Sequence, residues 1–356
     1  MLQKAFIPYG GYYSSPFSRW QGTLANENAI TLGAATAKRW LENKNWDPKI
    51  FDYAFLGITV HQPHGFYGGP WAAALMGADG VPGLLVSQAC STSTVAIYHA
   101  SVGVETGLYQ VPFCLMTDRC SNGPHAVWPN PMGPGGQVIS EDWLMDNFNR
   151  DPWAGEAMIK TAENVAAEAG ITREQCDAVA LRRYEQYQDA LADDRAFQKR
   201  YMFPVEVNVS KRKAVMVEAD EGVMESTAEG LAKLRPVLRD GAHTFGAQTH
   251  PADGNCGITV TTQDKAKELS ADPNIEIQVV SYGYARVKKA FMAAAVFPSV
   301  QMALENANLG AKDVSVIKTH NPFAANDIHL ASNLGIDVNG MNNFGSSLVY
   351  GHPQGP

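Results

Sequence analysis

Short apolar runs alternate with longer helical stretches in the first third of the chain and again near its end. Consecutive apolar residues bounded by turn residues are typical of strands covered on both faces. The expected strands are residues 51–60, 81–89, 111–117, 257–262, 275–283 and 314–319. The expected helices are residues 91–107, 154–169, 173–198, 298–308 and 324–334. This alternation predicts an α/β fold, with helices packed against a central sheet.

The middle of the chain has a different composition. Residues 118–149 are rich in Pro, Gly, Asn and Trp and show no clear period, which is typical of a long functional loop. Two amphipathic helices follow, and Thr172 is the expected N-cap of the second. The basic triplet at 211–213 is expected to lie on a solvated face. We interpret this region as an insertion that divides two α/β halves.

Composition limits the classes of partner. The chain has 356 residues and a formal charge of −8, which argues against nucleic acid and anionic membranes as partners. No apolar stretch reaches the roughly 20 residues of a membrane helix, and the N-terminus lacks a signal peptide's apolar region. Five scattered cysteines without a Cys-x-x-Cys pair indicate a reducing compartment and disfavour a structural zinc site. We therefore expect a cytoplasmic protein without a bound metal.

Cys90 lies where an expected strand runs into a helix rich in small residues. Unpaired N–H groups at the start of a helix favour a thiolate and can bind an oxyanion. The alternative is a buried core cysteine followed by Ser91 as the helix cap.

Two histidines near the end strengthen the first interpretation. His320 lies in Thr-His-Asn-Pro-Phe, and His352 lies in a Gly-His-Pro turn that holds its imidazole rigidly. Each histidine alone would usually be structural. A cysteine with two histidines at element junctions is the arrangement expected for nucleophilic acyl transfer. His61 and His64 lie in a Pro/Gly-rich loop without an acidic partner, so we do not expect a metal there.

Several ordered motifs resemble the thiolase superfamily over nearly the whole chain. The Cys90 segment resembles the family's nucleophile motif, and residues 155–166 (Gly-Glu-Ala-Met-Ile-Lys-Thr-Ala-Glu-Asn-Val-Ala) resemble its loop-domain segment. Residues 231–237 (Leu-Ala-Lys-Leu-Arg-Pro-Val) resemble the return to the core. Asn342 and Gly345, followed by Gly-His-Pro, are similar to the family's last block, and the His320 segment resembles its His-Asp-x-Phe variant.

The resemblance implies a fold of two similar α/β halves in a five-layer α-β-α-β-α sandwich. Residues 1–117 would form the N-terminal half, with a return segment at about 242–265, and residues 266–356 the C-terminal half. Residues 118–241 would form a loop domain over the coenzyme A site. Thiolases continue beyond the Gly-His-Pro turn to a second catalytic cysteine. We therefore expect an incomplete C-terminal half, truncated at its C-terminus.

The resemblance also implies site residues. Cys90 would attack a 3-oxoacyl-CoA, His352 would accept its proton, and His320 would stabilise the thioester enolate together with His352. Thr249, Met158 and Phe323 match positions that bind coenzyme A or line the acyl pocket.

The sequence departs from common thiolases at Ala157, at Ser346 and at Ala247-Gln-Thr-His, where the family has Asn-Ala-Ser-Gly. These departures, with an aromatic stretch at 61–71, predict a bulky or aromatic acyl group. The alternative for that stretch is a dimer interface.

Three functions remain open at this point. The first is a thiolase that works with acyl-CoA and CoA as a homodimer or tetramer. The second is a ketoacyl synthase or hydroxymethylglutaryl-CoA synthase type of condensing enzyme, which the Gly-His-Pro turn argues against. The third is a thiolase-like scaffold subunit in an acyl-transfer complex. Some thiolases of the His-containing type work with a small zinc-ribbon/OB-fold partner subunit, so we also consider such a partner.

Overall fold

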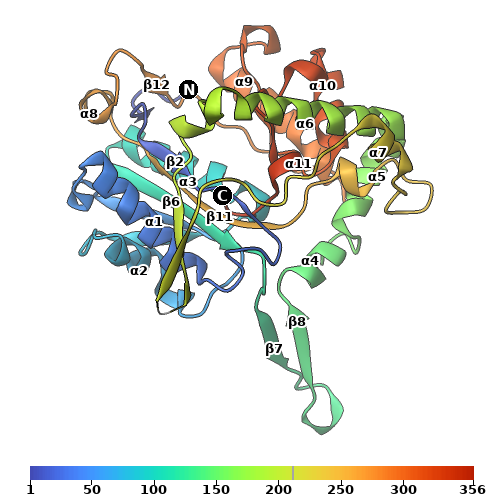
Figure 1. The fold of residues 1–356 in the computed structure, drawn as a ribbon, viewed down its shortest axis with the longest axis horizontal. Helices are drawn as coiled ribbons and strands as arrows, with labels where there is room; N and C mark the ends of the chain where they lie inside the picture. Colours follow the sequence, from blue (N-terminus) through green and yellow to red (C-terminus); the bar gives the residue numbers. More distant parts are fainter. Residues whose placement is uncertain (211) are drawn as a thin grey trace.

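The computed structural model describes residues 1–210 and 212–356, so Lys211 of the basic triplet lies outside the described residues. A six-stranded sheet forms the centre of the N-terminal part, in the order β2-β11-β6-β4-β5 with β3 also on β11 (Figure 1). β4 is parallel to β5 and β6, whereas β11 is antiparallel to β6, β2 and β3. Their bounds are β2 Tyr12–Ser14, β3 Ser18–Arg19, β4 Tyr53–Gly57, β5 Gly83–Val86, β6 Pro112–Arg119 and β11 Ala252–Thr259.

Helices cover both faces of this sheet. Along β6, Phe113 and Leu115 pack with α1 (Ala29–Lys44) and α2 (Gly68–Leu75), while Cys114 and Met116 pack with α3 (Thr92–Thr106). Successive side chains of a strand point to opposite faces, so a strand with apolar residues on both faces is buried on both. The expected α/β class is confirmed, and the three parallel strands β4, β5 and β6 lie where the apolar runs predicted them.

Two hairpins were not expected. The predicted loop at 118–149 contains β7 (His125–Pro129), β8 (Val138–Asp142) and α4 (Met145–Asn149), and the hairpin extends away from the body (Figure 1). A second hairpin pairs β9 (Val205–Ser210) with β10 (Lys213–Val217). Most residues of β7 and β8 are exposed on both faces, so they have no alternation between apolar and polar residues that would predict a strand.

The main helices after residue 150 agree with the prediction. They are α5 (Met158–Ala169), α6 (Arg173–Arg195), α9 (Val296–Ala307) and α10 (Ala324–Leu334). Thr172 is confirmed as the N-cap of α6, since its hydroxyl accepts a hydrogen bond from the Gln175 N–H and the Gln175 side chain accepts one from the Thr172 N–H. The remaining short elements are β1 (Phe6–Ile7), β12 (Ile277–Gln278), α7 (Ala228–Lys233), α8 (Gln263–Leu269) and α11 (Ser347–Tyr350).

The strand predictions of the second half were wrong in part. Only Ile277–Gln278 of residues 275–283 forms a strand, paired with β1, and the described residues 314–319 form none. A strand requires a neighbouring strand as hydrogen-bond partner. Here the Ile317 carbonyl instead accepts a bond from the Asn342 N–H (2.9 Å), and the Thr319 N–H donates to the Asn342 side chain (2.8 Å). Among the described helices, none is long and apolar enough to span a bilayer.

Candidate active site

Cys90 lies in a single 3₁₀ turn, Ala89–Ser91, between β5 and α3. Ala89 has a positive φ of 45°, so the chain turns sharply directly before the cysteine. The Thr92 hydroxyl holds this turn, accepting a bond from the Gln88 N–H and donating one to the Ala89 carbonyl, both at 2.8 Å. Ser91 does not cap α3 with its side chain, because its hydroxyl donates to the Gln88 carbonyl (2.9 Å). The turn therefore presents Cys90 at the carboxyl edge of the parallel strands.

The Gly-His-Pro turn brings His352 to the same place. Gly351 has a φ of 95°, and a Cβ there would lie 2.7 Å from the His250 ring, so only glycine fits. After the turn, the Gly355 N–H donates to the buried Asp118 carboxylate at 2.7 Å. Burial raises the pKa of Asp118 to about 8, although three backbone N–H donors act in the opposite direction. Asp118 thus fixes the segment that follows His352 against β6.

Cys90, His352 and Gln354 form a closed ring of hydrogen bonds. The Gln354 N–H donates to His352 Nδ1 (3.2 Å), so neutral His352 carries its proton on Nε2, which lies 3.1 Å from Cys90 Sγ. Cys90 Sγ lies 3.6 Å from Gln354 Oε1, where the thiol can donate. Cys90 as a residue is exposed, whereas its sulfur faces His352 and Gln354, and desolvation raises the pKa of the thiol to about 11. Desolvation also lowers the pKa of His352 well below its usual value, with a further contribution from His320.

His320 completes the cluster. Its ring centroid lies 4.1 Å from that of His352, and its Nδ1 lies 3.0 Å from the Ser347 hydroxyl. Because that hydroxyl donates to the Asn321 side chain (3.2 Å), His320 Nδ1 is the donor and Nε2 keeps the lone pair. Nε2 is buried and has no hydrogen-bond partner among the described residues. Burial lowers the pKa of His320 to about 4, so both imidazoles are neutral near pH 7.

One donor atom from each of Cys90, His320 and His352 lies within 4.8 Å of the other two. A thiolate with two imidazoles is a donor set that zinc accepts, and this is the one group of three or more such side chains found among residues 1–210 and 212–356. The same three side chains are a nucleophile with two neighbouring groups that can exchange protons.

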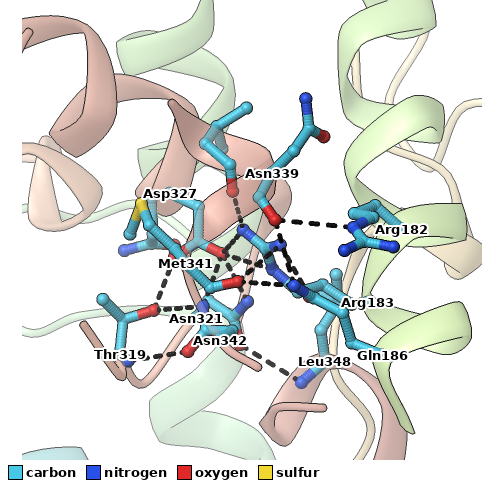
Figure 2. Close-up of polar contacts among 12 residues, drawn as sticks. Arg182, Arg183, Gln186, Thr319, Asn321, Asp327, Asn339, Met341, Asn342 and Leu348 are labelled. Carbon is cyan, nitrogen blue, oxygen red and sulfur yellow. Dashed lines mark hydrogen bonds and ion pairs between the residues drawn. The ribbon is translucent and has the colours of Figure 1, made fainter. Parts of the chain in front are cut away.

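A buried polar network holds the His320 segment (Figure 2). Arg183 of α6 and Asp327 of α10 form an ion pair at 3.0 Å, and both side chains are 0% exposed. Asp327 also accepts bonds from Thr319 (2.6 Å), Asn321 (2.7 Å) and Asn342 (3.0 Å). The residues on both sides of His320 are therefore anchored to the same carboxylate.

A cavity of about 450 Å³ opens beside the cluster. Besides Cys90, His320, His352 and Gln354, its lining includes Cys256 and the aromatic residues Phe17, Phe197, Tyr201, Phe344 and Tyr350. The aromatic stretch at 61–71 does not contribute to this lining, and Phe66 and Tyr67 are 90% and 72% exposed. The aromatic side chains of this cavity therefore come from segments other than residues 61–71.

The three residues expected at the coenzyme A site lie outside this lining. Thr249 is next to the cluster, since its hydroxyl donates to the Ser347 carbonyl (2.5 Å) and its N–H to the Pro322 carbonyl (2.7 Å). Phe323 is buried directly before α10, with its ring 5.7 Å from that of His243. Met158 begins α5 and is half-buried.

Sequence reasoning missed Gln354, Ser347 and Asp118. Gln354 comes directly after the Gly-His-Pro turn, so its position two residues after His352 could have identified it. Ser347 and Asp118 had no local signal, because their partners at His320 and Gly355 are distant in sequence.

Known proteins match nearly the whole chain. Residues 11–264 match the family model "Thiolase, N-terminal domain", and residues 274–356 match "Thiolase, C-terminal domain". The chain is 26% identical to the mitochondrial 3-ketoacyl-CoA thiolase of Homo sapiens, over 96% of this chain and 86% of that protein. It is 28% identical to an acetyl-CoA acetyltransferase of Escherichia coli (strain K12), over 94% and 85%.

Solved structures give the same result. The human mitochondrial 3-ketoacyl-CoA thiolase superposes with a TM-score of 0.89 at 25% identity, covering 100% of this chain and 89% of that one. An acetyl-CoA acetyltransferase of Bacillus anthracis superposes with a TM-score of 0.89 at 26% identity, covering 99% and 89%.

Proposed function

Because this chain belongs to the thiolase family and has the thiolase fold, we propose that it cleaves a 3-oxoacyl-CoA with CoA, or catalyses the reverse Claisen condensation. Its relatives are acyltransferases, and the chain is an enzyme of this type. The observation that carries the proposal is the cluster of Cys90, His320 and His352, which three distant segments contribute to one cavity. Cys90 is the nucleophile.

The reaction has two halves. Cys90 Sγ bonds to the 3-oxo carbon, the bond between C2 and C3 breaks, and the enolate of acetyl-CoA leaves and takes a proton. In the second half the sulfur of CoA bonds to the acyl carbon, and the bond to Cys90 Sγ breaks. The thiol proton of Cys90 ends on the enolate carbon, and the thiol proton of CoA returns to Cys90.

The hydrogen-bond pattern supports catalytic roles for His352 and His320 that differ from the expected ones. His352 directs Nε2–H at the sulfur, so it stabilises charge on Sγ and on a nearby oxyanion as a donor. His320 keeps a free lone pair on Nε2, so it takes each thiol proton and returns it. The sequence interpretation had assigned proton acceptance to His352.

Coenzyme A would lie between the loop domain, residues 118–241, and the two halves, 1–117 with 242–265 and 266–356. Thr249 supports this placement, because it bonds to Ser347, which also holds His320. Thr249, Met158 and Phe323 would contact the pantetheine arm and the acyl chain.

The acyl group is proposed to be bulky or aromatic. The support is now the aromatic lining of the cavity, in which Phe197 and Phe344 stack at 3.8 Å between centroids. Phe344→Ala is expected to reduce kcat/KM for an aromatic 3-oxoacyl-CoA more than for acetoacetyl-CoA. Equal losses on both substrates would contradict the assignment.

A homodimer or tetramer is the proposed assembly. The β7–β8 hairpin supports it, since it extends from the body with exposed Val127, Met132 and Val138. A small zinc-ribbon/OB-fold subunit is a further proposed partner. The mass of the native complex distinguishes these assemblies.

The function is tested by intact mass after incubation with acetyl-CoA. The expected result is an acetyl adduct that is absent in Cys90→Ser and present in Cys256→Ser, which alters the other thiol of the same cavity. Thiolysis of acetoacetyl-CoA should follow the same pattern. An adduct that survives in Cys90→Ser, or no adduct and no thiolysis in the wild type, would contradict the enzyme and favour the scaffold subunit.

A further inference from the structure

Gln354 is the one side chain of the hydrogen-bonded ring to which the proposed mechanism gives no task. It is 3% exposed, and it lines the cavity together with Cys90 and both histidines. Its backbone N–H faces His352 Nδ1 and its side-chain Oε1 faces Cys90 Sγ, so one residue touches both members of the Cys–His pair.

The backbone of Gln354 is held in an unusual conformation. Its φ is +67°, in the left-handed region that non-glycine residues rarely adopt. The contact of its N–H with His352, and the bond from the Gly355 N–H to Asp118, hold this conformation on both sides. Such local strain is maintained where the surroundings over-determine the position, and it often lies at functional sites.

The side-chain amide of Gln354 has an unsatisfied hydrogen-bond donor. Gln354 Nε2 is buried and has no hydrogen-bond partner among the described residues. A buried N–H group without an acceptor is costly, so an acceptor that forms during the reaction would be stabilised there. Rotation about the last side-chain torsion exchanges Oε1 and Nε2 without moving the backbone, and this torsion has two broad minima.

From these contacts we propose that Gln354 is a catalytic residue whose carboxamide responds to the charge on Cys90. While the sulfur carries its proton, Oε1 accepts the S–H bond. When the proton has left, the amide turns and Nε2–H donates to the thiolate, alongside His352 Nε2–H. The assignment rests on the proposed function in which Cys90 is the nucleophile.

The surroundings of the sulfur make a second donor valuable. Desolvation disfavours the anion, and His320, which carries the positive charge once it holds the thiol proton, makes no direct hydrogen bond to the sulfur among the described residues. The titratable groups near Cys90 are His352, His320 and Cys120, and Asp118 lies behind Gly355. The same cavity is also lined by Cys256, Tyr201, Asp220, Lys318 and Tyr350. A neutral amide donor stabilises the thiolate without adding a charge that must itself be buried.

The test measures the rate at which iodoacetamide alkylates Cys90 between pH 6 and 10, followed by peptide mass. The alkylation rate is measured without acyl-CoA, so a failure of this proposal can be distinguished from a failure of the proposed thiolase function. Gln354→Leu and Gln354→Met keep the approximate size and remove the amide. Both are expected to move the pH profile upward by about one unit or more, which slows alkylation at pH 8 roughly tenfold or more.

Gln186→Leu is the matched control. It removes another buried carboxamide, one that bonds to the Met341 carbonyl in the Arg183 network. It is expected to lower the melting temperature and to leave the pH profile of Cys90 unchanged. The proposal is overturned if either Gln354 variant is folded, by circular dichroism and melting temperature, and alkylates with the wild-type profile. It is also overturned if Gln186→Leu shifts the profile as far as the Gln354 variants do.

Discussion

Replacing Arg183 with Met tests how much the buried ion pair between α6 and α10 contributes to stability. Arg183 lies 3.0 Å from Asp327 and also donates to the carbonyls of Val338 (2.8 Å) and Met341 (3.1 Å). The substitution leaves the Asp327 carboxylate buried without its cation. Breaking a buried pair from one side typically costs about 3–5 kcal/mol. Asp327 keeps three other donors, so we expect a loss near the lower figure, about 3 kcal/mol.

This loss is large against a typical domain stability of about 5–15 kcal/mol. Urea unfolding followed by circular dichroism measures it as a lower midpoint at unchanged slope. The neighbouring Arg182 is a matched control, because its pair with Glu185 (3.3 Å) lies on the surface and its side chain is 38% exposed. Arg182→Met should cost less than about 1 kcal/mol.

A second variant tests the cause. Arg183→Met combined with Asp327→Asn removes the uncompensated charge and keeps a side-chain oxygen for the donors. The double variant is expected to be more stable than Arg183→Met alone. The reasoning is refuted if Arg183→Met lowers the free energy of unfolding no more than Arg182→Met does. It is also refuted if the double variant loses as much stability as the two single variants, Arg183→Met and Asp327→Asn, lose when summed.

Three further predictions follow from single contacts. Gly69→Ala would place a Cβ 2.8 Å from the backbone nitrogen of Leu84, so we expect a loss of about 1–3 kcal/mol in thermal unfolding, and an unchanged melting temperature would contradict this packing. Thr172→Ala removes the N-cap of α6 and should cost about 1 kcal/mol in urea unfolding, whereas no change would mean that the cap contributes nothing. The pKa of His320 is about 4 in the fold against 6.5 as its usual value, so the unfolded chain binds the proton first. The contribution of neutral His320 to the free energy of unfolding should be fully present above pH 6.5 and fall by up to about 3 kcal/mol towards pH 4. His320→Asn should flatten this pH dependence, and an unchanged slope would refute the assignment.

Much of the fold follows from local patterns. The helix 324–334 and the cap at Thr172 lie where the sequence predicted them, because amphipathic spacing and capping residues act over a few positions. The hairpin β7–β8 was missed because its strands are exposed on both faces. The strand expected at 314–319 does not form, since strand pairing depends on which distant segment lies alongside.

For the active site, the sequence by itself determined the nucleophile candidate and the two histidines as residues at element junctions. Their motifs are local, so spacing and resemblance are sufficient to find them. Only the tertiary structure decided how they work together. Cys90 and Gln354 are 264 positions apart, and the tautomers of His320 and His352 depend on Ser347 and Gln354. Hydrogen bonds between distant segments have no period or spacing in the chain. Which ring nitrogen of each histidine carries the proton is therefore decided only in the folded protein.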